Sequence, residues 1–321
     1  MLFWDKSSTF AVEMDLRTLL KSSGVRNFTK LLSANVVAQV IGLVVYPILT
    51  RMYAPEDFGL LNLFLSIGNV LVVLAVLDYY YAIVLPKEEK DAVALTQTSF
   101  FCLLLTAGLV LLSVAFAKPI SILFKMPDLT EYYWMMPIYV LAMGAWNILN
   151  YWYIRHKEYG CISRYQVSQS VLSAGGKLGF GALGLLHGGM IFSMVIAPLI
   201  ALLWSLFSNM RKTLVPLCNV SKNTMWQQGK QYRNFPLFVL PRSFINVLAT
   251  QLPVLLLTPF FGAKYVGLLS MAVLLAYTPI GTISRAIYQV LYQRTTEYVH
   301  QSLPIKSMFR RFIGYTSVVI I

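Results

Sequence analysis

The sequence predicts an all-α membrane protein, a polytopic bundle whose helices cross a bilayer about eight or nine times. Of its 321 residues, 57% are hydrophobic and only 12% are charged, whereas soluble domains carry about 25% charged residues. The apolar residues also gather in long runs, and a membrane-spanning helix needs about 20 of them. Lipid must therefore be the solvent over much of the chain.

Eight runs are long enough to cross a bilayer, and a ninth begins near Phe309. The eight are residues 30–50, 59–85, 94–116, 132–154, 166–186, 189–210, 236–260 and 265–290. The ninth run reaches Ile321 before it is long enough to span, so we expect the chain to be a piece of a longer protein. We expect a cytoplasmic N-terminal segment (1–29), a first six-helix half (30–210), a cytoplasmic linker (211–235) and an incomplete second half (236–321).

The charges predict the orientation. The chain has 26 Lys and Arg against 13 Asp and Glu, a net charge of +13, which in a soluble protein would suggest a nucleic-acid partner. Here the basic residues lie in short loops between apolar runs, which is how membrane proteins encode their orientation. An N-terminus in the cytoplasm puts 19 of the 26 inside and 4 outside. We therefore expect a multi-pass membrane protein with a cytoplasmic N-terminus and without a nucleic-acid partner.

An internal repeat is visible in two loops. The segment Ala54–Leu61 resembles Ala263–Leu269, and Gly59 corresponds to Gly267. Both copies lead from an outward to an inward span, so the repeat is parallel. It predicts two six-helix halves, with a binding site near the midplane between them.

Polar residues recur at helical spacing within several predicted spans, where they are costly unless they face protein or water. Two interpretations remain open: hydrogen bonds between helices, or a shared hydrated cavity that binds substrate. The candidate cavity residues are Asn35, Gln39, Gln166, Gln169, Lys177, Arg242, Asn246 and Arg285.

The charged members of this set favour an anion. Lys177 lies near the middle of the predicted span 166–186, while Arg242 and Arg285 lie nearer span ends. Three basic residues against one acid within the spans suit a phosphate, and a diphosphate headgroup is a natural candidate. The acid, Asp78, either pairs with an arginine or binds a coupling cation. Arg51 is either part of such a charge pair or an interface anchor.

Catalytic chemistry has no signal in this sequence. The Gly-rich phosphate loop, GxSxG and HExxH motifs do not occur. Three scattered cysteines give neither a disulfide framework nor a metal site. We therefore expect a transporter that is not an enzyme, with no catalytic residue, no metal and no cofactor.

Three segments carry a family likeness: Pro47–Gly59 (PILTRMYAPEDFG), Asp78–Glu89 (DYYYAIVLPKEE) and Tyr151–Tyr159 (YWYIRHKEY). They resemble the polysaccharide transporter family, the O-antigen and capsule flippases of the MATE-like MOP exporter superfamily. The resemblance implies twelve helices in two halves and a place in the bacterial cytoplasmic (inner) membrane. It implies that an undecaprenyl-diphosphate-linked oligosaccharide crosses that membrane by alternating access, for lipopolysaccharide, capsule or exopolysaccharide synthesis.

The resemblance also implies coupling to a proton or sodium gradient. The implied partners are the lipid-linked oligosaccharide, membrane lipids, and polysaccharide polymerase and chain-length proteins. Two alternatives remain. A multidrug or cation antiporter of the same superfamily would favour intramembrane acids, and a membrane glycan polymerase or ligase would need larger outer loops.

Overall fold

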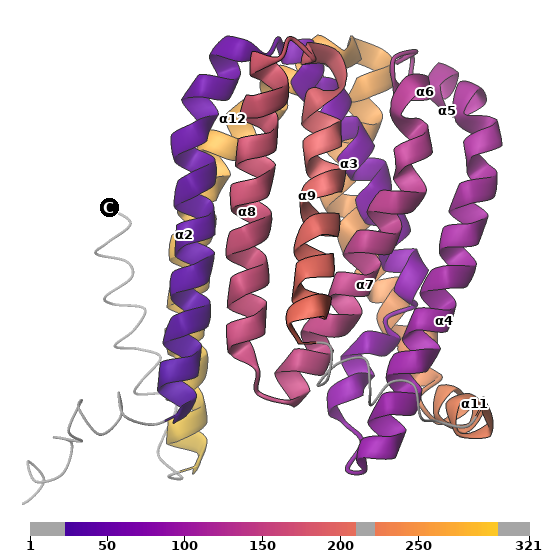
Figure 1. Ribbon diagram of the computed structural model, residues 1–321, viewed down its shortest axis with the longest axis vertical. Helices are drawn as coiled ribbons and strands as arrows, with labels where there is room; N and C mark the ends of the chain where they lie inside the picture. Colours follow the sequence, from indigo (N-terminus) through magenta and orange to yellow (C-terminus); the bar gives the residue numbers. More distant parts are fainter. Residues whose placement is uncertain (1–22, 210–221, 301–321) are drawn as a thin grey trace, which may run out of the picture. The chain divides into compact units, whose positions relative to one another are not determined.

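The computed structural model describes residues 23–209 and 222–300, and every regular element in these residues is helical (Figure 1). The all-α fold is therefore confirmed. The elements are α2 (Ser23–Met52), α3 (Pro55–Val76), η2 (Tyr79–Val84), α4 (Glu89–Ser113), η3 (Val114–Phe116), α5 (Ala117–Leu123), α6 (Leu129–Tyr132), η4 (Tyr133–Met135), α7 (Met136–Arg155), α8 (Tyr159–Ala182), α9 (Leu186–Ser208), α11 (Lys222–Gln231), η5 (Phe235–Val239) and α12 (Leu240–His300).

Each of the eight predicted spans contains a helix, and five described segments are both long and apolar enough to cross a membrane. These five are Asn35–Met52, Pro55–Val76, Glu89–Leu123, Gly188–Ser208 and Phe235–Leu275. Helices α7 and α8, of 20 and 24 residues, are long enough but carry more polar residues. The protein is thus a multi-pass membrane protein. The predicted ninth run, from Phe309, lies outside the described residues.

The chain divides into two compact units after Ala272, and the first unit contains α2 to α11 and the start of α12. Helix α12 is interrupted within this unit at Gly262, whose φ of 80° and ψ of 175° are not helical. Glycine adopts such a positive φ without steric cost. The interruption separates the two predicted spans 236–260 and 265–290.

The predicted span 59–85 is wrong in one respect, because its helix does not continue to residue 85. Helix α3 ends at Val76, and both Leu77 (φ 49°) and Asp78 (φ 55°) adopt left-handed backbone conformations. Such a conformation stops a right-handed helix. The chain continues as the 3₁₀ helix η2, and Asp78 therefore lies at a break and not within a span.

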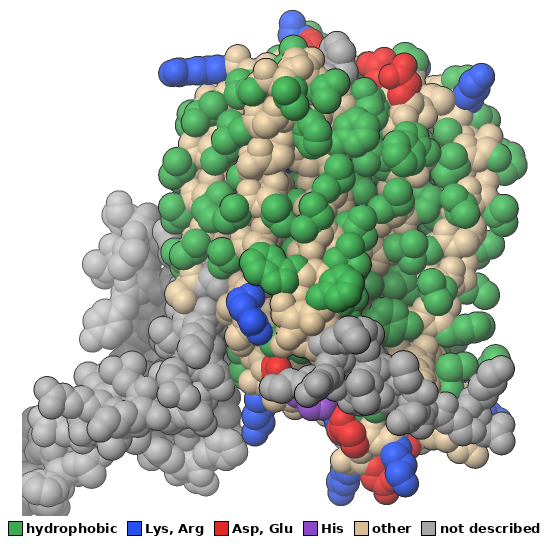
Figure 2. Space-filling view, viewed as in Figure 1, with side chains coloured by type: hydrophobic (Ala, Val, Ile, Leu, Met, Phe, Trp, Pro, Cys, Tyr) green, Lys and Arg blue, Asp and Glu red, His purple; other side chains and the backbone are tan. Residues whose placement is uncertain are grey.

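The core of this unit lies where α3 and α7 meet α4 and α9. Phe64 on α3 and Trp152 on α7 are among its largest fully buried side chains. The outward faces are apolar as well: Leu104 and Leu112 on α4 are 64% and 69% exposed. Figure 2 shows hydrophobic side chains over the middle of the face in view, with charged side chains at its two ends. This pattern is the one that a bilayer requires.

Candidate functional site

The two ends of the bundle provide the reference points for the site. At the Gly59 end, α2 and α8 finish and α3 begins. At the Arg155 end, α3 and α7 finish and α8 begins. Helices α2 and α8 are direct neighbours (Figure 1), and both run from the Arg155 end toward the Gly59 end.

The segment Pro55–Gly59 forms the start of α3, and each of its residue types has a local purpose. Pro55 takes the first helical turn, where its missing N–H is not needed. The Asp57 carboxylate accepts a hydrogen bond from the Ala54 amide at 2.9 Å, as a capping residue does. Phe58 packs edge-to-face on Tyr46 of α2, with ring centroids 5.8 Å apart. This motif therefore fixes the angle between α2 and α3.

The two glycines of the predicted repeat meet each other's helices reciprocally. A Cβ atom on Gly59 would overlap the backbone carbonyl of Ala263, and a Cβ atom on Gly267 would overlap the backbone carbonyl of Pro55. Pro55 and Ala263 each lie four residues before their own glycine. Reciprocal contacts of this kind arise from two-fold symmetry between equivalent elements. The contact supports the parallel repeat.

Lys177 lies nearer the Gly59 end than predicted. Helix α8 finishes at Ala182, so Lys177 is within its last two turns and not near the middle of a span. The Tyr53 hydroxyl donates a hydrogen bond to the Lys177 carbonyl oxygen at 2.6 Å. Burial, and secondly the charge of Asp57, raises the pKa of Tyr53, which keeps this donor protonated. The ammonium of Lys177 is partly buried and forms no ion pair with any described residue.

The polar stripes of α2 and α8 contain buried groups without partners. The Tyr46 hydroxyl and the Gln166 amide oxygen are buried, and neither has a hydrogen bond within the described residues. Buried polar groups in proteins are almost always hydrogen-bonded, to protein or to water. If these stripes served only to bond helices together, both atoms should have protein partners. Their lack of one favours the hydrated-cavity interpretation.

The other predicted residues lie in several places. Asn35 and Gln39 are half-buried on α2, and Gln169 is half-buried on α8. Arg51 is exposed in the last turn of α2, and Asn246 is exposed on α12. The Arg285 side chain lies outside the described residues, so its predicted role stays a prediction.

Arg242 lies at the opposite end of the bundle from Lys177. Arg242 is exposed near the start of α12 and is a charged neighbour of Asp78, just beyond the end of α3. Lys177 is level with Tyr53, just before the start of α3. Helix α3 has 22 residues, so the two cations are roughly 30 Å apart along the bundle. One diphosphate cannot contact both at once in this conformation.

Asp78 is completely buried. The side chains of Ser243 and Tyr80 are its polar neighbours, and Arg242 is its charged neighbour. A buried carboxylate is unfavourable unless it is neutralised by a proton, a cation or good hydrogen bonds. The site is consistent with both predicted roles of Asp78, the charge pair and the coupling cation.

Arg155 has a structural role that the sequence does not indicate. Its guanidinium pairs with Glu89 at 3.3 Å and donates hydrogen bonds to the carbonyl oxygens of Ile83, Pro86 and Glu88. His156 also contacts Glu89, at 2.8 Å. Arg155 thus fastens the segment between α3 and α4 to the end of α7. No spacing in the sequence identifies such a bond to backbone carbonyls.

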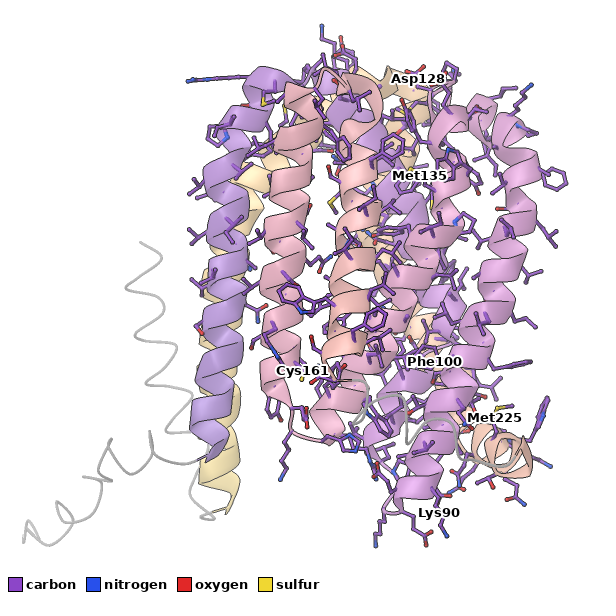
Figure 3. The ribbon with its side chains drawn as sticks, viewed as in Figure 1. Lys90, Phe100, Asp128, Met135, Cys161 and Met225 are labelled. Carbon is purple, nitrogen blue, oxygen red and sulfur yellow. The ribbon has the colours of Figure 1, made fainter. Side chains whose placement is uncertain are left out.

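A cavity of about 860 Å³ lies between α2, α8 and α9. None of the eight predicted cavity residues lines it. Cys161, which does, lies in the part of α8 near the Arg155 end (Figure 3). The predicted substrate cavity therefore stays a prediction, and the cavity between α2, α8 and α9 is a different feature.

Comparison with known proteins gives one match. A family model described as "Polysaccharide biosynthesis protein" matches residues 48–321. No curated protein and no solved structure matches the chain.

Proposed function

Because the chain belongs to the polysaccharide biosynthesis protein family, we propose that it is a flippase for lipid-linked oligosaccharides. It moves an undecaprenyl-diphosphate-linked unit across the bacterial cytoplasmic membrane by alternating access. The N-terminus and the Arg155 end of the bundle face the cytoplasm. The family assignment supports a role in polysaccharide synthesis, and the positive-inside distribution of basic residues supports this orientation.

The observation that carries the proposal is a set of polar groups on α2 and α8 that have no partner among the described residues. The Tyr46 hydroxyl and the Gln166 amide oxygen lack partners, and the Lys177 ammonium lacks a counter-ion among the described residues. Hydroxyl and amide groups suit sugars, and an ammonium suits phosphate. A lipid-linked oligosaccharide offers both chemistries and keeps its hydrocarbon chain in the bilayer.

The separation of the two cations suggests the order of events. Arg242, near the cytoplasmic end, meets the diphosphate on entry, and Lys177, near the outer end, meets it before release. Because the two cations lie at separate positions along the transport path, the diphosphate binds one cation at a time and is not held too tightly at either position. Asp78, beside Arg242, is suited to couple this first step to a proton or sodium ion.

Transport and not catalysis is the activity proposed here. The lipid-linked oligosaccharide is the substrate, and a polymerase and chain-length proteins are the expected partners on the outer side.

The test is complementation in cells whose surface polysaccharide depends on this protein. Lys177→Ala should cause lipid-linked oligosaccharide to accumulate on the cytoplasmic face and surface polysaccharide to fall, while Lys177→Arg keeps much of the activity. The control is Lys264→Ala, because Lys264 is exposed at the same end. Wild-type export by Lys177→Ala at equal protein level would remove Lys177 from the proposal. Chemical turnover of a lipid-linked sugar by the purified protein, without movement of that lipid across the membrane, would overturn the transport assignment itself.

A further inference from the structure

The cavity between α2, α8 and α9 is an apolar groove that is open to its surroundings. Val37 on α2, Val171 on α8 and Trp204 on α9 line it and are 45%, 50% and 63% exposed. Figure 2 shows the face over α8 and α9 covered mainly by hydrophobic side chains. In a membrane-spanning bundle such a face is in contact with hydrocarbon chains.

The lining changes from polar to apolar along the groove. Near the Arg155 end it includes Arg164, at the start of α8, and Ser208 and Asn209, at the end of α9. Further along α8 and α9 it consists mainly of Val171, Leu172, Ala201 and Trp204. A groove that is polar at the membrane surface and apolar toward the middle matches a lipid, whose headgroup and hydrocarbon chain are arranged in the same order.

Arg164 is the cation at the polar end. It is exposed, its Nε donates to the Gly160 carbonyl at 3.3 Å, and one terminal nitrogen contacts the Cys161 sulfur at 3.4 Å. Glu158 contacts the same sulfur at 3.3 Å. A guanidinium has five N–H donors, so Arg164 keeps donors for a bidentate bond to a phosphate.

Tyr165 closes the inner side of the groove. It lines the groove, is 2% exposed, and stacks on Trp146 of α7 with ring centroids 3.3 Å apart. Its hydroxyl is buried beneath the surface, so a lipid in the groove would contact the outer side chains and would not bond to this hydroxyl.

We propose that this groove binds an anionic glycerophospholipid, with its phosphodiester on Arg164 and an acyl chain along Val171 and Trp204. Among the described residues that line the groove, Arg164 is the one cation, which favours a phosphodiester, with one charge, over the diphosphate of the transported substrate. The site does not depend on the flippase assignment, because it would bind a resident lipid whatever the protein moves.

The experiment is native mass spectrometry of the purified full chain with added phosphatidylglycerol or phosphatidylcholine. The wild-type chain should retain phosphatidylglycerol in preference to phosphatidylcholine. Arg164→Ala should weaken phosphatidylglycerol binding by about tenfold, the loss expected for one charge-assisted bond, and Arg164→Lys should retain part of it. Val171→Trp should fill the groove and remove the retained lipid.

The matched control is Leu109→Trp, which adds the same side chain at an exposed apolar position on α4, outside the groove. It should leave lipid retention unchanged. Equal phosphatidylglycerol binding by the wild type and Arg164→Ala, or by the wild type and Val171→Trp, would overturn the proposal. Displacement of the bound lipid by polyprenyl diphosphate at equal concentration would also overturn it, since the groove would then belong to the substrate. Thermal unfolding confirms that each variant is folded.

Discussion

Gly59 and Gly267 each lie in close contact with the backbone of the segment that carries the other glycine. A side chain on either glycine would overlap a carbonyl group four residues before its counterpart, at Ala263 or Pro55. The nitrogen of Gly59 is also only 3.1 Å from the Cβ position of Gly267. Two helices can approach this closely only where both lack side chains. The two copies of the sequence repeat thus contact each other at the Gly59 end of the bundle.

This contact predicts that a side chain at either glycine separates the two helices. Gly59→Val and Gly267→Val should each destabilise the folded chain by about 1–3 kcal/mol, the usual cost of overpacking. Because both substitutions act on one contact, the double variant should cost less than the sum of the single variants. Thermal or denaturant unfolding in detergent measures all three.

Gly108→Val is the control, since a Cβ atom at Gly108 has no heavy atom within 4 Å. Strict additivity of Gly59→Val and Gly267→Val would show that the two glycines do not share a contact.

A second prediction concerns Arg155. Its loss would leave the carbonyl groups of Ile83, Pro86 and Glu88 without their donor. Arg155→Ala should therefore destabilise the chain by about 2 kcal/mol or more. Arg155→Lys should recover little, because an ammonium cannot reach several acceptors in the geometry of a guanidinium.

The comparison for this prediction is Arg233→Ala, because Arg233 is exposed and its side chain forms no ion pair with a described residue. Unfolding midpoints in the same detergent give the difference. Equal midpoints for Arg155→Ala and Arg155→Lys are expected. A midpoint of Arg155→Ala that equals the wild type would mean that η2 holds its position without this arginine.

The helices could be predicted from the sequence, because the lipid core requires a run of apolar residues in each one. The residues at which the helices end could not be predicted. The break at Leu77 and Asp78, for example, contains neither glycine nor proline, the residues that usually indicate a helix end. The predicted mid-span position of Lys177 is wrong because α8 begins at Tyr159 and ends at Ala182, and its first residues form a polar stretch with the hydropathy of a loop.

Features that several helices form together could not be predicted from the sequence either. The groove beside Arg164 needs α2, α8 and α9 together, and the bonds of Arg155 go to backbone atoms, which have no sequence signature. The match between Gly59 and Gly267 was visible as a repeat, but only the structure brings the two glycines into contact.

Asp78 leads to a third prediction, which separates stability from transport. Its carboxylate is fully buried, and its φ of 55° suits asparagine as well as aspartate. Asp78→Asn removes the buried charge and keeps the backbone, so the unfolding midpoint should stay the same or rise. Transport should fall if the charge of Asp78 couples the cycle to an ion.

Surface polysaccharide in a complemented strain, together with the unfolding midpoint, measures both quantities. Asp128→Asn is the matched control, because it makes the same change on the loop before α6. Full transport by Asp78→Asn would exclude a coupling role, and a large fall in its unfolding midpoint would instead identify Asp78 as half of a stabilising pair with Arg242.

The distance between Lys177 and Arg242 gives the last prediction. The two cations lie at opposite ends of α3, roughly 30 Å apart, so in one conformation they cannot bind the same diphosphate. The effects of Lys177→Ala and Arg242→Ala on the affinity for polyprenyl diphosphate should therefore add, since distant sites without shared partners behave independently. Isothermal titration with purified single and double variants measures this. A strong departure from additivity would mean that the protein closes around the headgroup and brings the two cations together, and the proposed order of entry at Arg242 and release at Lys177 would then fail.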